Sequence, residues 1–292
     1  MNLRRGPRAS CLSRALVCLF AAVMPAAARA TTPCEEIVGF NLVSRAPGIF
    51  VSDMHGTSEP PAFLRALVCN LVHSGRAVVI ALEYPSAEQH FIDEFLHAGT
   101  PTPQLVLLGS PFWTRPTQDG RTSRAMLSLL EWVRQETANG ARVRVVAFDS
   151  LPATSNQPGG AASFDARDRA MAQRLRDELS KAGADEMPVV FTGNVHARKT
   201  KGLEALNAPP GMENAQPLGY RLRDLGFLHM NIDYRGGSAW ICFSPSDCGV
   251  RDLGKPGAAV SSYSIVRSAD PAYDLRYFVG PLTASPPAAI VK

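Results

Sequence analysis

Several features that mark common classes of protein are missing from this chain. It has no long block of lysine or arginine, no Cys-x-x-Cys pair and no Gly-x-Ser-x-Gly sequence. These absences exclude a basic nucleic-acid footprint, give a zinc-ribbon or thioredoxin-like site weak support, and remove the serine nucleophile elbow. The longest early apolar stretch, Ala15 to Ala27, is shorter than the about 20 residues of a membrane-spanning helix.

The first thirty residues are typical of a secretory signal. Arg4, Arg5 and Arg8 precede the apolar stretch, which ends at the small-x-small sequence Ala28-Arg29-Ala30. The whole chain has 30 Lys and Arg against 26 Asp and Glu, and this leader holds five of the arginines, which leaves 25 against 26. We therefore expect a periplasmic or secreted protein with no stable membrane anchor and no nucleic-acid partner.

The remaining chain is long enough for one large domain, predicted over residues 31–282, with a loose tail over 283–292. Its cysteines are Cys34, Cys69, Cys242 and Cys248. Four cysteines in an exported chain indicate two disulfides, for which three pairings exist. We favour the sequential one, Cys34 with Cys69 and Cys242 with Cys248.

Strand-like and helical patterns alternate through the first two thirds of the chain. The strand-like runs are nearly continuous in apolar residues, which is typical of strands buried on both faces, and the helical segments between them carry apolar residues three and four apart. This order predicts an α/β fold, a mostly parallel sheet with helices on both faces built from βαβ units. The predicted strands are 48–51, 77–82, 143–148 and 189–192, and the predicted helices are 60–74, 87–97, 123–137 and 165–181.

The pattern changes beyond about Leu203. Proline and glycine become common, and short strand-like runs appear at 238–243, 261–266 and 275–279. We interpret these runs as a C-terminal antiparallel extension of the same domain. Two long loops stand out before it, a Gly- and Ala-containing one over 155–163 and a second over 109–122 that contains Trp113 and Arg121.

Ionisable residues follow all four predicted parallel strands. Asp53 and His55 follow the first, Glu83 the second, Asp149 the third, and His196 and Arg198 the fourth. Ligands bind at the carboxyl ends of strands in open α/β sheets, so these side chains should converge. Asp149 is the weakest candidate, because an aspartate after a strand also caps helices.

The stretches around the two histidines echo each other. Ser52-Asp53-Met54-His55-Gly56 and Gly193-Asn194-Val195-His196-Ala197 both follow an apolar run with a small residue, two further residues, a histidine and a small residue. The echo suggests a duplicated βαβ unit that contributes two half-sites.

Together with the strand-end Ala81-Leu82-Glu83 and Arg167-Asp168-x-x-Met171-Ala172, these motifs resemble the superfamily of erythromycin esterase-like proteins, ChaN-like haem-binding proteins and the TraB/GumN (Tiki) group. The resemblance spans about Pro47 to Arg198. The second Gly-x-x-His element matches fully, whereas the first has Ser52 in place of glycine and Asp53 where many relatives have glutamate. The resemblance implies an α/β sheet with paired histidines and strand-end carboxylates, in esterases, metal-dependent peptidases or haem binders.

We therefore predict a hydrolase of ester or peptide bonds that acts on a small-molecule or peptide substrate. His55, Glu83 and His196 are the predicted catalytic residues and the predicted ligands of a divalent metal, if one is used. The predicted binding residues around them are Asp53, Glu59, Arg121, Arg167 and Arg198. The alternatives are a haem- or metal-binding protein of ChaN-like type and a structural exported domain without chemistry.

Overall fold

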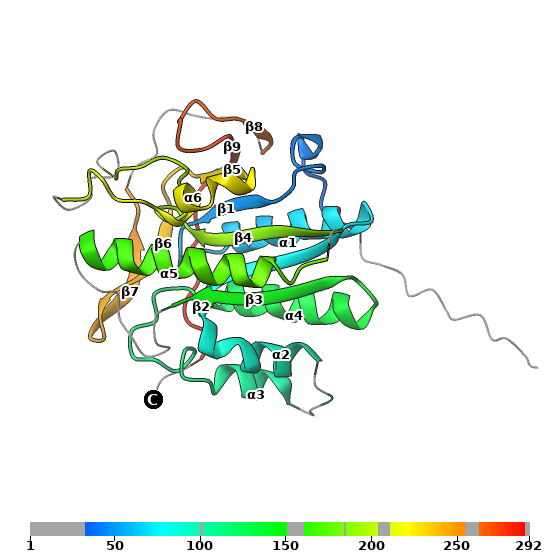
Figure 1. Cartoon of the computed structure of the whole chain (residues 1–292). Helices are drawn as coiled ribbons and strands as arrows, with labels where there is room; N and C mark the ends of the chain where they lie inside the picture. The colour runs from blue at the N-terminus through cyan, green and yellow to red at the C-terminus, as the bar shows by residue number, and fades with distance from the viewer. Residues whose placement is uncertain are drawn as a thin grey trace, which may run out of the picture. The chain divides into compact units, whose positions relative to one another are not determined.

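Seven strands form one sheet in the order β3-β2-β4-β1-β5-β9-β8 (Figure 1). The computed structural model describes residues 33–97, 99, 102–150, 161–183, 185–203, 211–254 and 263–289. The predicted signal and residues 155–160 of the predicted 155–163 loop lie outside these residues, whereas 161–163 are the first residues of a helix and not a loop. No helix in the described part of the chain is long and apolar enough to cross a membrane.

The four predicted strands are β1 (Ile49–Asp53), β2 (Ala77–Pro85), β3 (Val143–Asp149) and β4 (Glu186–Gly193), and all pair in parallel. The helices are α1 (Glu59–His73), α2 (Gln89–His97), α3 (Pro103–Leu108), α4 (Arg124–Ala138), α5 (Ala161–Leu179) and the short α6 (Leu218–Arg221). The predicted α/β fold with a mostly parallel sheet is therefore confirmed.

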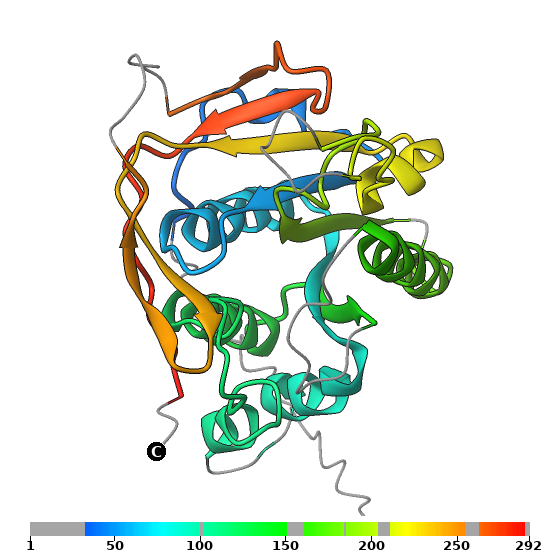
Figure 2. The ribbon, with the colours of Figure 1, turned by 90° about the vertical axis from the view of Figure 1, so that its left-hand side faces the viewer.

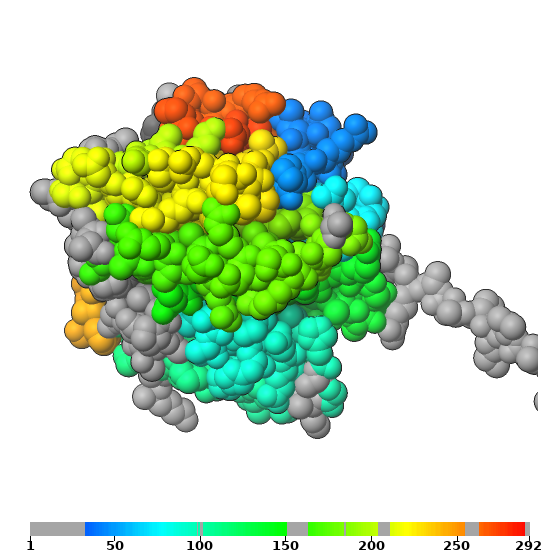
Figure 3. Space-filling view, in the orientation of Figure 1, coloured from blue at the N-terminus to red at the C-terminus, as the bar shows by residue number. Residues whose placement is uncertain are grey.

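Helices cover both faces of the sheet, because its strands are apolar on both sides. Ile49 and Val51 belong to the core that includes α1, α2 and α4, whereas Phe50 between them packs in a second core with α5 and α6. Figure 3 shows the second of these faces, where the side chains of α5 and α6 (green and yellow) cover the sheet. Burial on both faces explains the continuous apolar runs of the central strands.

The C-terminal part corrects one expectation. The run at 275–279 becomes β9 (Leu275–Phe278), which pairs in parallel with β5 (Leu228–Asp233), a strand that the sequence analysis missed. Among the strands of the described residues, antiparallel pairing joins β8 (Ile265–Arg267) to β9, and β6 (Ser238–Ser244) to β7 (Asp247–Asp252) in a separate hairpin. The β5 sequence LHMNID mixes polar and apolar residues, so it lacked the continuous apolar signal of β1–β4.

Residues 283–289, the described part of the predicted loose tail, form hydrogen bonds with the rest of the domain. The Ser285 amide donates to the Gly56 carbonyl at 2.8 Å, and the Ala288 amide donates to the Thr122 carbonyl at 3.0 Å. The Ser285 hydroxyl accepts from the Ala125 amide in the first turn of α4. The tail thus supplies backbone partners to the start of a helix, a role that its proline-rich composition did not reveal.

Both predicted disulfides are present. Cys34–Cys69 joins the start of the described chain to α1, and Cys242–Cys248 joins β6 to β7. Their sequence separations are 35 and 6 residues. The longer loop restricts the unfolded chain more strongly, so the first disulfide should stabilise the fold more.

Replacing Cys34 and Cys69 by serine should lower the free energy of unfolding by about 3 to 4 kcal/mol, because a long loop is released in the unfolded state. The same change at Cys242 and Cys248 should cost about 2 kcal/mol. Urea unfolding followed by circular dichroism measures both values. A larger loss from the second pair would contradict the loop-length argument.

Candidate functional site

Adjacent parallel strands bring polar side chains to one edge of the sheet. Asp53 and Asp149 are the last residues of β1 and β3, and Gly193 is the last of β4. Glu83 lies near the end of β2, between β3 and β4. Figure 2 views the sheet from the side where these strands end. The predicted convergence of strand-end residues is confirmed, because parallel neighbours end on the same side.

Glu83 is the centre of this cluster and is almost completely buried. Its Oε2 accepts hydrogen bonds from the Thr192 hydroxyl at 2.6 Å and the Gly193 amide at 2.8 Å, and its Oε1 accepts from Arg167 Nη2 at 2.6 Å. Burial by itself would raise the pKa of Glu83, but its neighbours His196, Arg167 and His55 lower it well below its ordinary value. Glu83 is therefore an ionised carboxylate held in one orientation.

Two aspartate–histidine pairs stand on either side of Glu83. His55 Nδ1 lies 2.6 Å from Asp53 Oδ2, and His196 Nδ1 lies 2.8 Å from Asp168 Oδ1. The other ring nitrogens point toward Glu83, with His55 Nε2 at 3.7 Å from Oε2 and His196 Nε2 at 4.0 Å from Oε1. A carboxylate on Nδ1 orients an imidazole and leaves Nε2 for other partners.

Gly193 lies between the two rings. A Cβ atom at this position would be 3.2 Å from His55 Nε2, 3.6 Å from Glu83 Oε2 and 3.6 Å from His196 Cδ2. His55 Nε2 and His196 Cδ2 therefore both lie within contact distance of the same point, the Cβ position of Gly193. The absence of a side chain at Gly193 keeps this small space open, which gives the glycine of the second motif a physical reason.

Two buried arginines hold the carboxylates together. Arg167 donates to Asp149 through Nε at 3.1 Å and Nη2 at 2.7 Å, in addition to its bond with Glu83. Arg121 Nη1 donates to the Glu83 carbonyl at 3.1 Å and to Asp149 Oδ2 at 2.9 Å, and its Nη2 bonds Asp119 at 2.7 Å. The cluster therefore includes Arg121, Arg167 and Asp149, although Asp149 was the weakest candidate from sequence.

The protonation of His55 follows from its two carboxylate neighbours. Burial disfavours the charged ring, but Asp53 and Glu83 outweigh it and raise the pKa of His55 to about 10. Burial also raises the pKa of Asp53, which the charge of His55 only partly offsets. In the free protein at neutral pH, His55 is therefore an imidazolium, with about a fifth of its side chain exposed.

His196 carries its proton differently. Arg167 Nη1 lies 3.1 Å from His196 Nε2, and a guanidinium can only donate, so Nε2 accepts and the ring proton sits on Nδ1 facing Asp168. The Phe164 ring stacks on the imidazole at 5.1 Å between centroids. His196 is thus fixed from three directions and is more buried than His55.

Asp168 belongs to the motif Arg167-Asp168-x-x-Met171-Ala172 and is a member of the cluster, although it was not among the predicted site residues. Its Oδ2 accepts from the Leu218 amide at 2.6 Å at the start of α6. The sequence of α5 is rich in alternating charges, and apart from its place in that motif nothing local distinguishes Asp168 from the helix's other acidic residues. Only the packing of α5 against β4 and α6 shows its role.

Two predicted binding residues lie outside the hydrogen bonds of this cluster. Glu59, the first residue of α1, accepts from the Thr283 amide at 2.9 Å and so anchors the C-terminal segment. Arg198 lies near Tyr273 and Asp270, with its guanidinium 3.8 Å from the Asp270 carboxylate. Among the described contacts, neither residue bonds to His55, Glu83 or His196.

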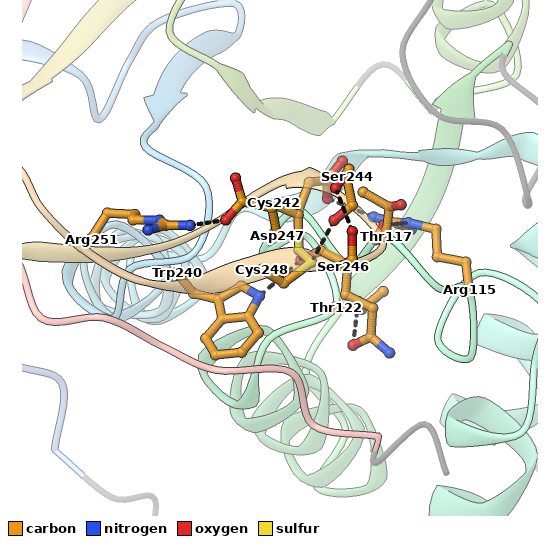
Figure 4. Close-up of a disulfide and its surroundings, with 12 residues drawn as sticks. Arg115, Thr117, Thr122, Trp240, Cys242, Ser244, Ser246, Asp247, Cys248 and Arg251 are labelled. Carbon is orange, nitrogen blue, oxygen red and sulfur yellow. Dashed lines mark hydrogen bonds and ion pairs between the residues drawn. A yellow bond between two sulfur atoms is a disulfide. The ribbon is translucent and has the colours of Figure 1, made fainter.

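The β6–β7 hairpin braces two of the loops that carry the cluster. The Trp240 amide donates to the Gly56 carbonyl at 2.9 Å, and its indole Nε1 donates to the Gln118 carbonyl at 3.0 Å. Figure 4 shows Trp240 beside the Cys242–Cys248 disulfide, over the segment that includes Thr117 and Thr122. Gly56 adopts a φ of 78° and packs directly on the Trp240 backbone, so a side chain there would be strained and would collide.

The cluster does not fit the divalent metal that the sequence analysis considered. Both Glu83 oxygens and His196 Nε2, three of the candidate ligand atoms, already accept hydrogen bonds from protein donors. Two arginines add positive charge at the same place. Arg167 likewise occupies the nitrogen of His196 that would bind haem iron, and we derive no step through a metal or haem.

Another group among the described residues, Cys34, Cys69 and His73, has its ligand atoms within 4.8 Å of one another. The two sulfurs form a disulfide, and metal ligation requires thiolates. With the disulfide formed, this group therefore does not fit a metal either.

Comparisons with known proteins place the fold. No protein-family model and no curated protein match the chain. Among solved structures it is similar to a succinoglycan biosynthesis protein, with a TM-score of 0.61 and 11% identity over 85% of this chain and 90% of that one. It is similar to a Bacillus cereus protein with a TM-score of 0.59 and 12% identity over 84% of this chain and 91% of that one. It is also similar to a variant of the erythromycin esterase EreC in its open conformation, with a TM-score of 0.57 and 12% identity over 86% of this chain and 94% of that one. The predicted resemblance is thus confirmed at the level of the fold.

The raised pKa of His55 makes the stability of the protein depend on pH. The pKa of His55 is about 10 in the folded protein and about 6.5 in the unfolded chain. The stabilisation that its ion pairs give the folded protein is therefore complete below pH 6.5 and is lost as pH rises to 10. Wild type should therefore lose on the order of a few kcal/mol more than His55→Gln between pH 6 and pH 10. Urea unfolding at both pH values, with exposed His90→Gln as control, measures the difference; equal losses in wild type and His55→Gln would rule out the ion pair.

Proposed function

From a fold shared with an erythromycin esterase, we propose that this chain is an exported hydrolase of ester or peptide bonds that uses histidine and carboxylate acid–base chemistry. The observation that supports it is the pair of aspartate-bound histidines on either side of a buried, ionised Glu83. No serine elbow is present, and the cysteines of the described chain form disulfides, so water is the natural nucleophile.

His55 is the proton-transferring residue of this proposal. It is the more exposed of the two histidines, and Asp53 on Nδ1 orients it so that Nε2 faces the space beside Gly193. Once its proton is lost, Nε2 takes a proton from water, and the imidazolium then returns it to the leaving group. Asp53 and Glu83 make the ring a stronger base by raising its pKa.

Glu83 and Arg167 are assigned supporting roles. The Glu83 carboxylate stabilises positive charge on His55, and its three donors prevent it from turning away. Arg167 connects Glu83, Asp149 and His196 Nε2. His196 is therefore a positioning residue in the free protein, because Arg167 occupies the nitrogen that would act as a base.

An oxidising compartment is part of the proposal. Two disulfides are the usual feature of periplasmic and secreted proteins, and the sequence predicts an export signal. We propose a small-molecule or peptide substrate. The alternative of a haem-binding protein receives no support from the hydrogen bonding of the two histidines.

Replacing His55 by alanine should lower kcat/KM by about 10²- to 10⁴-fold, the range for loss of a general base. His196→Ala should lower it less, because it acts through Arg167. Activity of wild type should rise with pH up to about 10, where His55 becomes neutral. A panel of nitrophenyl esters and fluorogenic peptides at pH 6 to 10 provides the rates, with His90→Ala as control. Unchanged hydrolysis in His55→Ala would end this proposal.

Gly193→Ala tests the reaction space itself. The added methyl group would sit 3.2 Å from His55 Nε2 and 3.6 Å from Glu83 Oε2, so it should abolish most hydrolysis while the protein stays folded. Gly249→Ala is the matched control, since a Cβ atom at Gly249 meets no atom within 4 Å. The rates and the melting temperatures of both variants decide the result; full activity in Gly193→Ala would place the reaction elsewhere.

A further inference from the structure

Four arginines are buried in the described part of the chain, and three of them are bound to nearby carboxylates. Arg115 bonds Asp119 at 2.5 Å. Arg121 bonds Asp119 at 2.7 Å and Asp149 at 2.9 Å, and Arg167 bonds Glu83 at 2.6 Å and Asp149 at 2.7 Å. The charges of these three arginines are therefore paired with carboxylates of the protein itself.

Arg198 is the exception. Only 8% of its side chain is exposed, yet its closest carboxylate is that of half-exposed Asp270 at 3.8 Å, beyond hydrogen-bond distance. Its Nε is buried and has no hydrogen-bond partner among the described residues. A buried charge is costly unless a counter-charge pairs with it, so this guanidinium is suited to an anion that arrives from outside.

The neighbours of Arg198 leave its charge uncompensated. The Tyr273 ring centroid lies 5.9 Å from the guanidinium, and the Tyr273 hydroxyl donates to the Asn194 carbonyl at 2.7 Å and accepts a hydrogen bond from Arg198. The adjacent cation, Lys199, is paired with Asp274. Among the buried arginines of the described residues, Arg198 is thus the one whose charge has only a neutral phenol and a distant, solvated carboxylate beside it.

Arg198 also belongs to the turn that carries His196. The His196 and Ala197 amides both donate to the Gly193 carbonyl, at 2.9 and 3.1 Å, and the Asn194 amide donates to the Asp53 carbonyl at 3.0 Å. This short, bonded turn connects the centre of the site with Arg198. Tyr273 ties the turn to the segment before β9.

We propose that Arg198 binds an oxyanion, a carboxylate or a phosphate, on the substrate of the hydrolytic site. The planar guanidinium fork matches both groups in bidentate geometry. The inference rests on the proposed function and narrows it to esters or peptides that carry an anionic group.

Kinetics on two matched substrates form the first test. One is a nitrophenyl monoester of a dicarboxylic acid, and the other is its neutral counterpart, in which a methyl group replaces the free carboxylate. Arg198→Gln should lower kcat/KM about tenfold for the anionic ester, as expected for a lost charged hydrogen bond, and less than about twofold for the neutral one. Arg198→Lys should recover part of the loss, and exposed Arg267→Gln should change neither rate. Equal losses on both esters in Arg198→Gln would overturn the inference and leave the proposed function intact.

Titration calorimetry with inorganic phosphate and with succinate, at constant ionic strength, gives a readout that does not need turnover. Wild type and Arg267→Gln should bind at least one of the two anions, which identifies the group, and Arg198→Gln should bind about tenfold more weakly. If wild type hydrolyses neither ester, the proposed function fails while this titration still decides on Arg198. Equal anion affinity in wild type and Arg198→Gln refutes the subsite.

The melting temperature of Arg198→Gln completes the design. Because Arg198 lacks a close counter-charge, its replacement should not lower the melting temperature. A structural role would instead show as a lower melting temperature together with a loss of rate on both esters.

Discussion

The buried carboxylate of Glu83 is the interaction on which this site depends. A carboxylate in the interior is unfavourable unless donors and positive charges surround it. Here β4 supplies a hydroxyl and a backbone amide, and α5 supplies Arg167. In satisfying Glu83, the fold also fixes the distances between β1, β2, β4 and α5, and so the positions of both histidines.

The charge of Glu83 also sets the chemistry of its neighbours. Together with Asp53 it keeps His55 protonated to high pH, while Arg167 occupies Nε2 of His196. Two histidines in echoing motifs thus end in different protonation states. The same hydrogen bonds that separate their roles fill the positions a metal would need, which is why acid–base chemistry fits this cluster better than metal ligation.

Much of the central fold followed from local pattern. β1–β4 are continuous apolar runs because both their faces are covered, and such runs are recognisable in a single sequence. β5 and β9 lie toward the side of the sheet, where β5 mixes polar with apolar residues, so their parallel pairing was missed. The contacts of residues 283–289 were missed for a related reason: they are hydrogen bonds to Gly56, Thr122 and α4.

By itself, the sequence determined the α/β class, the number of disulfides and the strand-end candidates Asp53, His55, Glu83 and His196, because strand period, cysteine count and parallel topology are local or combinatorial properties. Only the tertiary structure decided that Asp168 orients His196, that Asp149 joins the arginines, that Glu59 anchors the C-terminal segment, and that Arg198 lacks a close carboxylate among the described residues. These outcomes depend on distances between segments far apart in the chain, and on which charges find partners once water is excluded.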